Sequence, residues 1–440
     1  MHTIIHGDCL EELKKLDDNS VDAVICDPPY GLSNTKPQQV ADVLKAWVTG
    51  ETEAVPAKRG GFMGADWDSF VPPPAVWEEC MRVLKPGGHM AVFAGARTQD
   101  LMGLSIRLAG FEIRDTLGWI YGSGFPKSHD IGKAIDKAAG AEREVVGRTK
   151  TPFKVDAAAY RGTSLQGSVN GDFSKQVDEN GYRYTEHTAP ATSGAQRWDG
   201  WGTALKPAIE PIILARKPLD GTVANNVLAH GVGGLNIDAC RVGASGGGTR
   251  CNNRDAAGKC LGHKGGSAWD TFHGDESSGG RFPANVLLDE HAAKEMDKQS
   301  GVTVSRAGKR NAPKDAGTFG AYAGDDPDRM GHTDSGGASR FFHVFKYQAK
   351  APKRERPVIE REDGTKIQHP TVKPLKLMEW LITLITPEGG LILDPFAGTG
   401  TTLQAATNKG FRPIGIEADT DYIQLIHKRL EGGTTSTRSS

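Results

Sequence analysis

The feature that most constrains the fold is a buried strand followed by a glycine-rich turn and a helix, from Leu391 to Thr402. Gly398 and Gly400 let the backbone approach a ligand closely at the start of the helix. A second strand from Arg412 to Ile416 ends at Glu417, which is placed to accept hydrogen bonds from ribose hydroxyls. No lysine follows Gly400 and no third glycine completes a dinucleotide motif. The pattern therefore predicts an α/β sheet that binds a nucleoside-type cofactor.

A second motif, Asp27-Pro28-Pro29-Tyr30, follows the apolar run from Val21 to Cys26, which we expect to be a buried strand. The carboxylate of Asp27 can only accept hydrogen bonds when ionised, and the prolines present carbonyls without N–H groups. Tyr30 adds a flat ring that can stack on a planar substrate. An ordinary turn explains Asp-Pro-Pro equally well when it stands alone. Together with the glycine-rich turn, the motif predicts a receptor for a planar base with an exocyclic amino group, adenine or cytosine.

Strands and helices alternate over residues 1–121, which is typical of a mostly parallel α/β sheet. The alternation of strand and helix signals is interrupted between Gly31 and Phe70, where we expect a long loop. The apolar run Ile209–Arg216 predicts a strand that pairs with Ile113–Tyr121 at the edge of the sheet, where Pro211 is tolerated.

The domain organisation that we expect has two catalytic halves separated by variable segments. The expected segments are a target-base half (1–121), a variable insertion (122–207), a returning strand (208–217), a target-recognition region (218–340), a cofactor half (341–431) and a disordered tail (432–440). The region 218–340 is rich in Gly, Ser, Asp and Arg, which predicts irregular structure or ordering on a partner.

Composition narrows the class of protein. The net charge is −1, so any footprint for nucleic acid must be a local patch. The six cysteines are scattered, which suits a reducing cytoplasm. Cys251, Cys260 and His263 match no common zinc spacing, so we expect no metal. No signal peptide or membrane-spanning run is present, which predicts a cytoplasmic protein.

With both motifs in hand, the chain resembles the DNA amino methyltransferases that use S-adenosylmethionine. The order of the motifs is similar to that of the β group, a circular permutation of the usual fold. The chain also resembles DNA methylases of phages and prophages, and the expected cell is a bacterium, infected or not. Further matching segments are Gly7 to Cys9, Leu84 to Gly88, Gly118 to Lys127, Leu205 to Pro211 and Thr371 to Pro374.

The resemblance implies a Rossmann-like fold with a seven-stranded, mostly parallel sheet, helices on both faces and a glycine-rich target-recognition insertion. It implies that Asp8 contacts the adenine of the cofactor, Glu417 the ribose, and Thr371 with Lys373 the methionine end. The implied catalytic residues are Asp27, Pro28, Pro29 and Tyr30. The implied cofactor-binding residues are Asp8, Cys9, Thr371, Lys373, Asp394, Pro395, Phe396, Gly398, Gly400, Thr401 and Glu417.

The function that follows is methyl transfer to the N6 amino group of adenine in a specific sequence of double-stranded DNA, with the base flipped out of the duplex. Members of the family with Asp at the first motif position favour adenine, whereas Ser favours N4 of cytosine, which stays the alternative. Cytosine C5 chemistry is rejected because no Pro-Cys pair occurs. Methylation of RNA and an inactive nucleic-acid-binding regulator are further alternatives. The sequence leaves open the DNA sequence recognised, a homodimer and a paired restriction nuclease.

Overall fold

The computed structural model describes residues 2–33, 35–56, 68–122, 124, 128–154, 182–243, 280–305, 334–345, 356–361, 364, 366–368 and 372–433. The chain divides into two compact units, one made of Met1–Ser123 with Ala208–Ser440 and one of Gly124–Pro207. Within the described residues, every helix is too short or too polar to cross a membrane.

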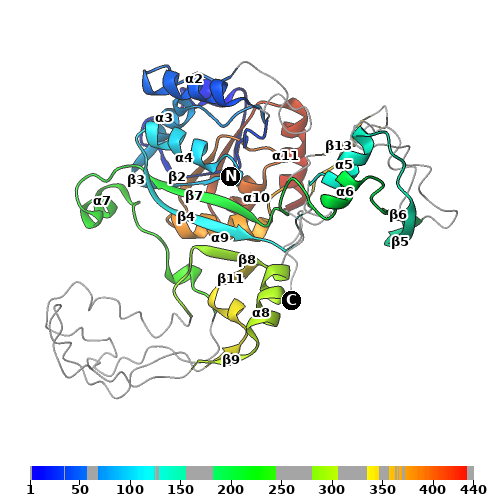
Figure 1. The fold of residues 1–440 in the computed structure, drawn as a ribbon. Coiled ribbons are helices and arrows are strands. Elements are labelled where there is room, and N and C mark those ends of the chain that lie inside the picture. The colour runs from blue at the N-terminus through cyan, green and yellow to red at the C-terminus, as the bar shows by residue number, and fades with distance from the viewer. Residues whose placement is uncertain are drawn as a thin grey trace, which may run out of the picture. The chain divides into compact units, whose positions relative to one another are not determined.

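The larger unit is built on one nine-stranded sheet (Figure 1). The strands lie in the order β1 (Thr3–His6), β15 (Arg412–Glu417), β14 (Leu391–Asp394), β2 (Val21–Cys26), β3 (Leu84–Phe93), β7 (Ile209–Arg216), β4 (Glu112–Ile120), β8 (Val286–Asp289) and β11 (His343–Phe345). All neighbours are parallel except β7, which runs antiparallel to β3 and β4. The mostly parallel α/β sheet that the sequence predicts is confirmed.

Helices cover both faces of this sheet, so the central strands are apolar on both sides. On β3, Met90 and Val92 belong to the same core as α1 to α4, whereas Ala91 and Phe93 belong to the core under α9 and α10. The helices of this unit are α1 (Cys9–Leu13), α2 (Pro37–Val48), α3 (Pro74–Val83), α4 (Gln99–Leu108), α7 (Val223–His230), α8 (Glu290–Ser300), α9 (Leu375–Ile385), α10 (Thr401–Asn408) and α11 (Thr420–Gly433). Short elements are η6 (Asp238–Cys240), η7 (Ala338–Phe341), and the pairs β9 (Thr303–Val304) with β10 (Ser335–Gly336) and β12 (Ile359–Glu360) with β13 (Lys366–Ile367).

The sheet is larger than the seven strands that we expected. Its two extra strands, β8 and β11, come from the stretch 280–345, of which residues up to 340 were expected to be irregular. That expectation was wrong for the described parts of the region, because a run as short as Val286–Asp289 gives a weak local signal and gains its partner, β4, only through the fold.

Two further expectations need correction. Strand β7 pairs with β4 as predicted, but it lies inside the sheet between β3 and β4 and not at the edge. Pro211 is tolerated because it lies beyond the end of β3, where its carbonyl accepts a hydrogen bond from Ala94 N at 3.0 Å. The expected loop Gly31–Phe70 contains the twelve-residue helix α2. Val43 and Trp47 of α2 are four residues apart and both buried, so its periodicity was present but was hidden by the surrounding Gly, Pro and Thr.

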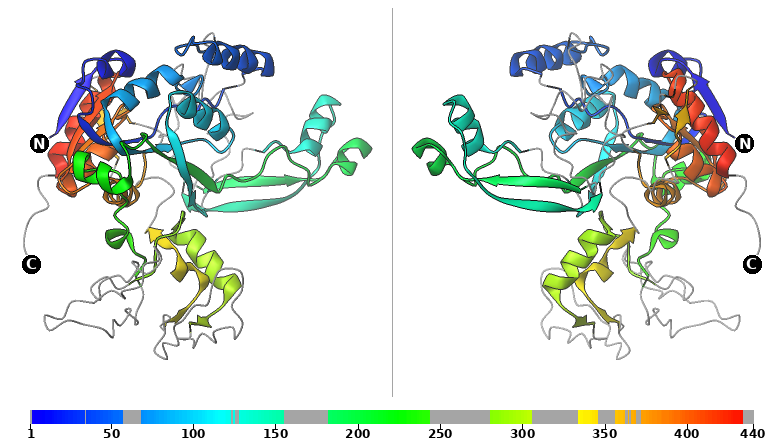
Figure 2. Two further views of the ribbon diagram at one scale, coloured as in Figure 1. Left: turned by 90° about the vertical axis from the view of Figure 1, so that its left-hand side faces the viewer. Right: turned by 90° about the vertical axis from the view of Figure 1, so that its right-hand side faces the viewer.

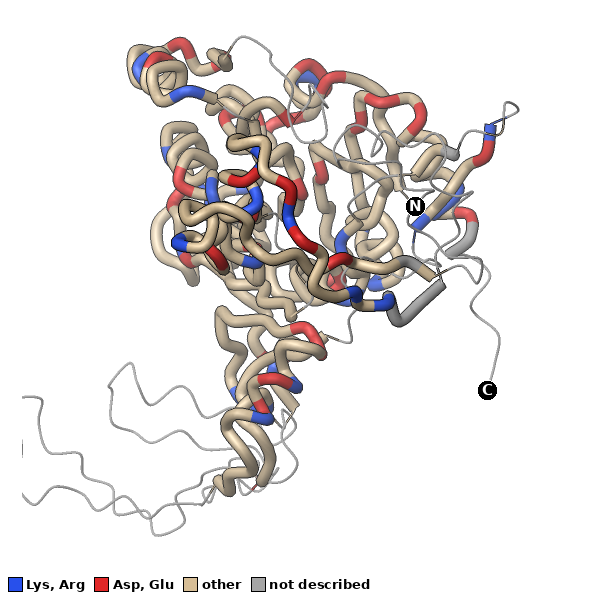
Figure 3. The backbone as a smooth tube through the Cα atoms, turned by 45° about the vertical axis from the view of Figure 1, so that its right-hand side comes forward, with Lys and Arg blue, Asp and Glu red and all other residues tan. Residues whose placement is uncertain are grey.

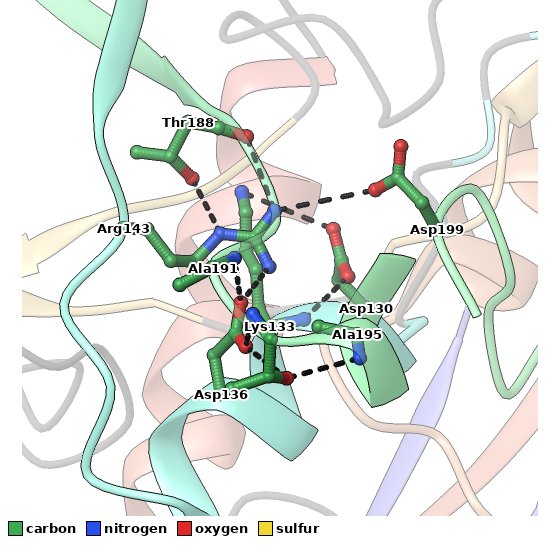
Figure 4. A network of polar contacts seen from close by, with 9 residues as sticks. Asp130, Lys133, Asp136, Arg143, Thr188, Ala191, Ala195 and Asp199 are labelled. Atoms are coloured by element: carbon green, nitrogen blue, oxygen red, sulfur yellow. Dashed lines mark hydrogen bonds and ion pairs between the residues drawn. The ribbon is translucent and has the colours of Figure 1, made fainter. Parts of the chain in front are cut away.

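The smaller unit contains α5 (Ile131–Ala138), α6 (Ser193–Arg197) and an antiparallel hairpin of β5 (Val145–Lys154) and β6 (Tyr182–Thr188) (Figure 2). Its centre is the buried carboxylate of Asp136 (Figure 4). Asp136 accepts hydrogen bonds from Arg143 Nη1 at 2.8 Å, from the N–H groups of Ala191 and Thr192 at 3.0 Å, and from Thr192 Oγ1 at 2.7 Å. Burial raises the pKa of Asp136, but these donors lower it further, so the net shift is downward. The network joins the start of the hairpin to α6.

Candidate active site

Carboxylates from several strands gather at one edge of the large sheet. Asp27 follows β2, Asp394 ends β14 and Glu417 ends β15, and these three strands are parallel neighbours. Strand β1 is parallel to β15 and is followed by Asp8. Because β7 runs the other way, its second residue, Glu210, begins at this same edge. The carboxyl ends of parallel strands are the usual place for a ligand in such sheets.

The turn that follows β2 is held from two sides. Tyr30 Oη donates a hydrogen bond to Asp27 Oδ1 at 2.7 Å. The buried carboxylate of Asp68 accepts the N–H groups of Tyr30 and Gly31 at 2.7 and 3.0 Å, and Thr98 Oγ1 donates to the carbonyl of Tyr30 at 2.6 Å. The turn is therefore fixed by side chains from separate segments, which is what precise placement of a reacting group requires.

Lys373 joins this turn to β7. Its Nζ lies 3.2 Å from Asp27 Oδ1, 2.8 Å from Tyr30 Oη and 2.8 Å from Glu210 Oε2. It also lies 4.8 Å from the ring centre of Phe93 and 5.2 Å from that of Tyr30. Burial alone lowers the pKa of Lys373, but the carboxylates of Asp27 and Glu210 raise it further, so the net shift is upward and the ammonium form is kept.

The tyrosines beside this ammonium group stay neutral. Burial and the charge of Asp27 raise the pKa of Tyr30 well above its usual value. Burial and Glu210 raise the pKa of Tyr121 to about 12, although Lys373 acts in the opposite direction. Both hydroxyls therefore stay protonated near neutral pH, and that of Tyr30 keeps donating to Asp27.

The glycine-rich turn connects β14 to α10. Asp394 Oδ1 accepts the N–H of Phe396 at 3.0 Å, and Glu417 Oε2 accepts the N–H of Gly398 at 2.8 Å. Gly398 and Gly400 have φ of 52° and 76°, in the left-handed region that favours glycine. A Cβ on Gly400 would lie 3.0 Å from Ile426 Cγ2 of α11. The first turn of α10 has no side-chain cap, because its N-cap residue is Gly400.

Two carboxylates flank this turn in unequal surroundings. Burial raises the pKa of Asp394 to about 7, against hydrogen bonds from Thr402 and Phe396 that lower it. Burial also raises the pKa of Glu417, whose Oε1 accepts the N–H of Asp419 at 2.8 Å. Each carboxylate oxygen has more than one lone pair, so the contacts with the backbone of Gly398, Ala418 and Asp419 leave Glu417 with acceptor capacity for a ligand hydroxyl.

The remaining predicted residues line the same edge. Asp8 caps α1 by accepting the N–H groups of Leu10 and Glu11 at 3.0 and 3.3 Å. Burial and the neighbouring Asp8 raise the pKa of Cys9 to about 12, so its thiol stays protonated. The ring of Phe396 lies 6.2 Å from that of Trp77.

The structure brings most of the predicted residues together. The residues Asp27 to Tyr30 form one group with Lys373, whereas Asp394, Pro395, Phe396, Gly398, Gly400 and Thr401 form the turn that rests on Glu417. Thr371 lies outside the described residues, as do Cys251, Cys260 and His263. In the described part of the chain, His, Cys, Asp and Glu form no cluster able to hold a metal ion.

Three site residues escaped the sequence analysis. Asp68 and Thr98 hold the backbone of the Tyr30 turn, and Glu210 holds Lys373. Glu210 stood in a segment that matched the resemblance and at the start of a predicted strand, but its role depends on the antiparallel direction of β7. Asp68 and Thr98 carried no local signal, because their partners are 38 and 68 residues away in the sequence.

Two hollows elsewhere on the described surface are separate from this edge. One, of about 260 Å³, is lined by α7 and the end of α9, and includes Val227, Leu235 and Thr386. The other, of about 410 Å³, runs along α4 beside Ile213. The converging polar side chains, rather than either hollow, mark the candidate site.

The chain matches a known protein family and is similar to several known methyltransferases. The N6/N4 DNA methylase family matches residues 21–220 and 262–428. Type II methyltransferase M.HindIII of Haemophilus influenzae is 22% identical over 97% of this chain and 94% of its own length. Type II methyltransferase M2.DpnII of Streptococcus pneumoniae is 50% identical over 64 residues, 14% of this chain and only 24% of that relative. Among solved structures, the PvuII DNA methyltransferase, described as cytosine-N4-specific, is 13% identical with a TM-score of 0.43, covering 100% of this chain and 89% of that one.

Proposed function

Because the chain belongs to the N6/N4 family of DNA methylases, we propose that it transfers a methyl group from S-adenosylmethionine to the N6 amino group of adenine in a specific sequence of double-stranded DNA. The observation that carries this proposal is the meeting, at one sheet edge, of the Asp27–Tyr30 turn with the glycine-rich turn between β14 and α10. One turn offers acceptors and a ring to a base, and the other offers a close backbone approach to a nucleoside.

The residues at the glycine-rich turn fit the cofactor. Gly400 leaves the start of α10 without a side chain over it, and Glu417 keeps acceptor capacity for ribose hydroxyls. S-adenosylmethionine supplies an activated methyl group on a sulfonium. We assign Asp394, Pro395, Phe396, Gly398, Gly400 and Thr401 to its binding, with Glu417 at the ribose, Asp8 and Cys9 at the adenine and Thr371 at the methionine end.

Lys373 fits the cofactor less well than the target base. An ammonium group has three N–H donors, and Nζ already has three partners in Asp27, Tyr30 and Glu210. A contact with the methionine carboxylate would replace one of them. The cofactor role of Lys373 stays a prediction, and the geometry favours a role beside the base.

In the proposed mechanism, the chain activates a weak nucleophile by position. The lone pair of the adenine amino group is delocalised into the ring, so its nitrogen must be turned toward tetrahedral geometry. Asp27 and the carbonyl of Pro28 accept its two N–H groups, with Pro29 keeping the turn extended. Both contacts of Asp27 described above use Oδ1, so Oδ2 is the oxygen that we assign to the base. Tyr30 stacks on the base, which is flipped out of the duplex because its amino group cannot be reached inside the stack.

The choice of target belongs to the segments between the catalytic halves. We propose that residues 218–340 carry target recognition, that 122–207 are a variable insertion and that the motif order reflects a circularly permuted fold. Described acidic and basic residues are interspersed along the backbone (Figure 3), so contacts with DNA phosphates would come from local groups rather than from net charge. We propose that the enzyme is cytoplasmic, in keeping with DNA and S-adenosylmethionine as its partners.

Cytosine N4 is the second candidate, since the same acceptors suit its amino group and the family includes both chemistries. Cytosine C5 chemistry is disfavoured further by Cys26, which is fully buried and whose pKa burial raises well above its usual value. No described feature of this site favours methylation of RNA or a purely regulatory role over methylation of DNA.

The test is to incubate the protein with methyl-labelled S-adenosylmethionine and unmethylated DNA or RNA, and to identify labelled nucleosides by mass spectrometry. We expect N6-methyladenine in DNA. Labelled N4-methylcytosine would keep the mechanism and overturn the base. Label only in RNA, or none in any substrate with cofactor bound, would contradict the proposal.

A further inference from the structure

Glu210 lies beside the residues assigned to the base but has no role in the mechanism proposed above. It is the second residue of β7, and the antiparallel direction of that strand brings it to the edge where β2 ends. Its Oε2 lies 2.8 Å from Lys373 Nζ, and 27% of its side chain is exposed. The other carboxylate on the same ammonium is Asp27, at 3.2 Å.

The charges in this cluster do not cancel. Asp27 and Glu210 are carboxylates, Lys373 is an ammonium, and the Tyr30 hydroxyl that contacts Asp27 and Lys373 is neutral. The cluster therefore carries one net negative charge. Without Glu210, the ammonium would pair with Asp27 alone, and the group that faces the base would be neutral.

That difference matters when a methyl group moves to an amino nitrogen. The nitrogen lone pair forms the new N–C bond while the electrons of the S–C bond return to sulfur, which leaves as a neutral thioether. Positive charge therefore passes from sulfur to nitrogen until one N–H proton moves to Asp27 Oδ2 and from this partly exposed carboxyl to solvent. A net negative cluster beside the nitrogen stabilises this charge, and a neutral one does so weakly. Stabilisation of the transition state by preorganised charge is usually the largest single contribution to enzymatic catalysis.

We propose that Glu210 is a positioning residue for the transfer: it holds the ammonium of Lys373 and keeps the cluster with Asp27 net negative. The inference rests on the proposed function and deepens it. Lys373 then orders the Tyr30 hydroxyl and Asp27 without neutralising the carboxylate that faces the amino group.

The experiment compares three variants in the label-transfer assay. Glu210→Gln keeps the shape and removes the charge, and we expect kcat to fall by about 10- to 100-fold with KM for cofactor and DNA within about threefold. In the double variant Glu210→Gln with Lys373→Met, the net negative charge returns, so kcat should recover part of that loss. Glu11→Gln, which breaks the exposed pair with Lys14 at the end of α1, is the matched control and should match wild type.

Cofactor binding and thermal unfolding of each variant establish that it is folded. If Glu210→Gln does not fold, Glu210→Asp replaces it, and kcat should fall by about 3- to 10-fold because the charge is withdrawn by one methylene. A kcat of Glu210→Gln within about threefold of wild type, or a double variant slower than Glu210→Gln, would overturn the inference. A wild-type protein that labels no nucleic acid would instead refute the proposed function.

Discussion

Asp27 and Asp394 end neighbouring strands but are held in opposite surroundings. Asp394 is buried among apolar residues and N–H or hydroxyl donors, and its pKa is raised to about 7. Asp27 is partly exposed and touches the ammonium of Lys373. A partly neutral carboxyl suits a structural place under the glycine-rich turn, and a charged one suits contact with a base.

The raised pKa of Asp394 makes stability depend on pH. The folded protein holds the proton of Asp394 up to about pH 7, whereas the unfolded chain releases it near pH 4. The free energy of unfolding therefore falls as the pH rises from about 4 to about 7, by a few kcal/mol at most. Above pH 7 the whole loss of stability from ionising Asp394 is present. Asp394→Asn removes the titrating group and keeps an oxygen that accepts the N–H of Phe396. The melting temperature of this variant relative to wild type should therefore rise from pH 5 to pH 8. Both proteins are measured without cofactor.

Glu417 does not confound this comparison. Burial also raises the pKa of Glu417, so this residue too lowers the free energy of unfolding as the pH rises. Its effect is the same in wild type and in Asp394→Asn, because both proteins contain it. An Asp394→Asn difference in melting temperature that is equal at both pH values, or larger at pH 5, would contradict a raised pKa for Asp394.

At the scale of elements, the sequence predicted the parts whose signal is local. Strands β2 and β14 are short, mostly apolar runs, β15 contains two isoleucines before Glu417, and the turn at Gly398 and Gly400 follows from two glycines in fixed places. What could not be predicted were partners far apart in the chain. The resemblance implied that Lys373 contacts the methionine end of the cofactor, and no local signal placed its side chain beside Asp27, 346 residues earlier by their numbers. Pairing of short strands such as β8 is decided by the fold, not by their own four residues.

Gly400 tests the turn as an element. Gly400→Ala should lower the free energy of unfolding by about 1 to 3 kcal/mol, because φ is positive and Ile426 is in the way. It should also weaken cofactor binding. Gly410→Ala is the matched control: its φ is 80°, yet nothing lies within 4 Å of an added Cβ. Chemical denaturation and calorimetry should show a loss of about 1 kcal/mol for Gly410→Ala, with cofactor affinity unchanged.

Equal losses of stability in the two glycine variants would mean that the contact with Ile426 is unimportant. Unchanged cofactor affinity in Gly400→Ala would contradict the placement of the cofactor at this turn.

At the scale of the whole molecule, the site is assembled from three separate parts of the larger unit. The N-terminal part contributes Asp27 and Tyr30, β7 contributes Glu210, and the C-terminal part contributes Lys373 and the glycine-rich turn. The boundary between β2 and β14 separates the residues assigned to the base from those assigned to the cofactor. We therefore predict that base binding and cofactor binding can be separated by substitution.

Asp27→Asn tests whether the residues assigned to the base can be separated from those assigned to the cofactor. Cofactor affinity and label transfer to DNA are measured on the same sample, with Asp18→Asn as an exposed control that should change neither. Because we assign Asp27 to the base and assign it no contact with the cofactor, transfer should fall by about 10³-fold or more while cofactor affinity stays within about threefold of wild type. Transfer within about tenfold of wild type, or loss of cofactor binding, would contradict the account.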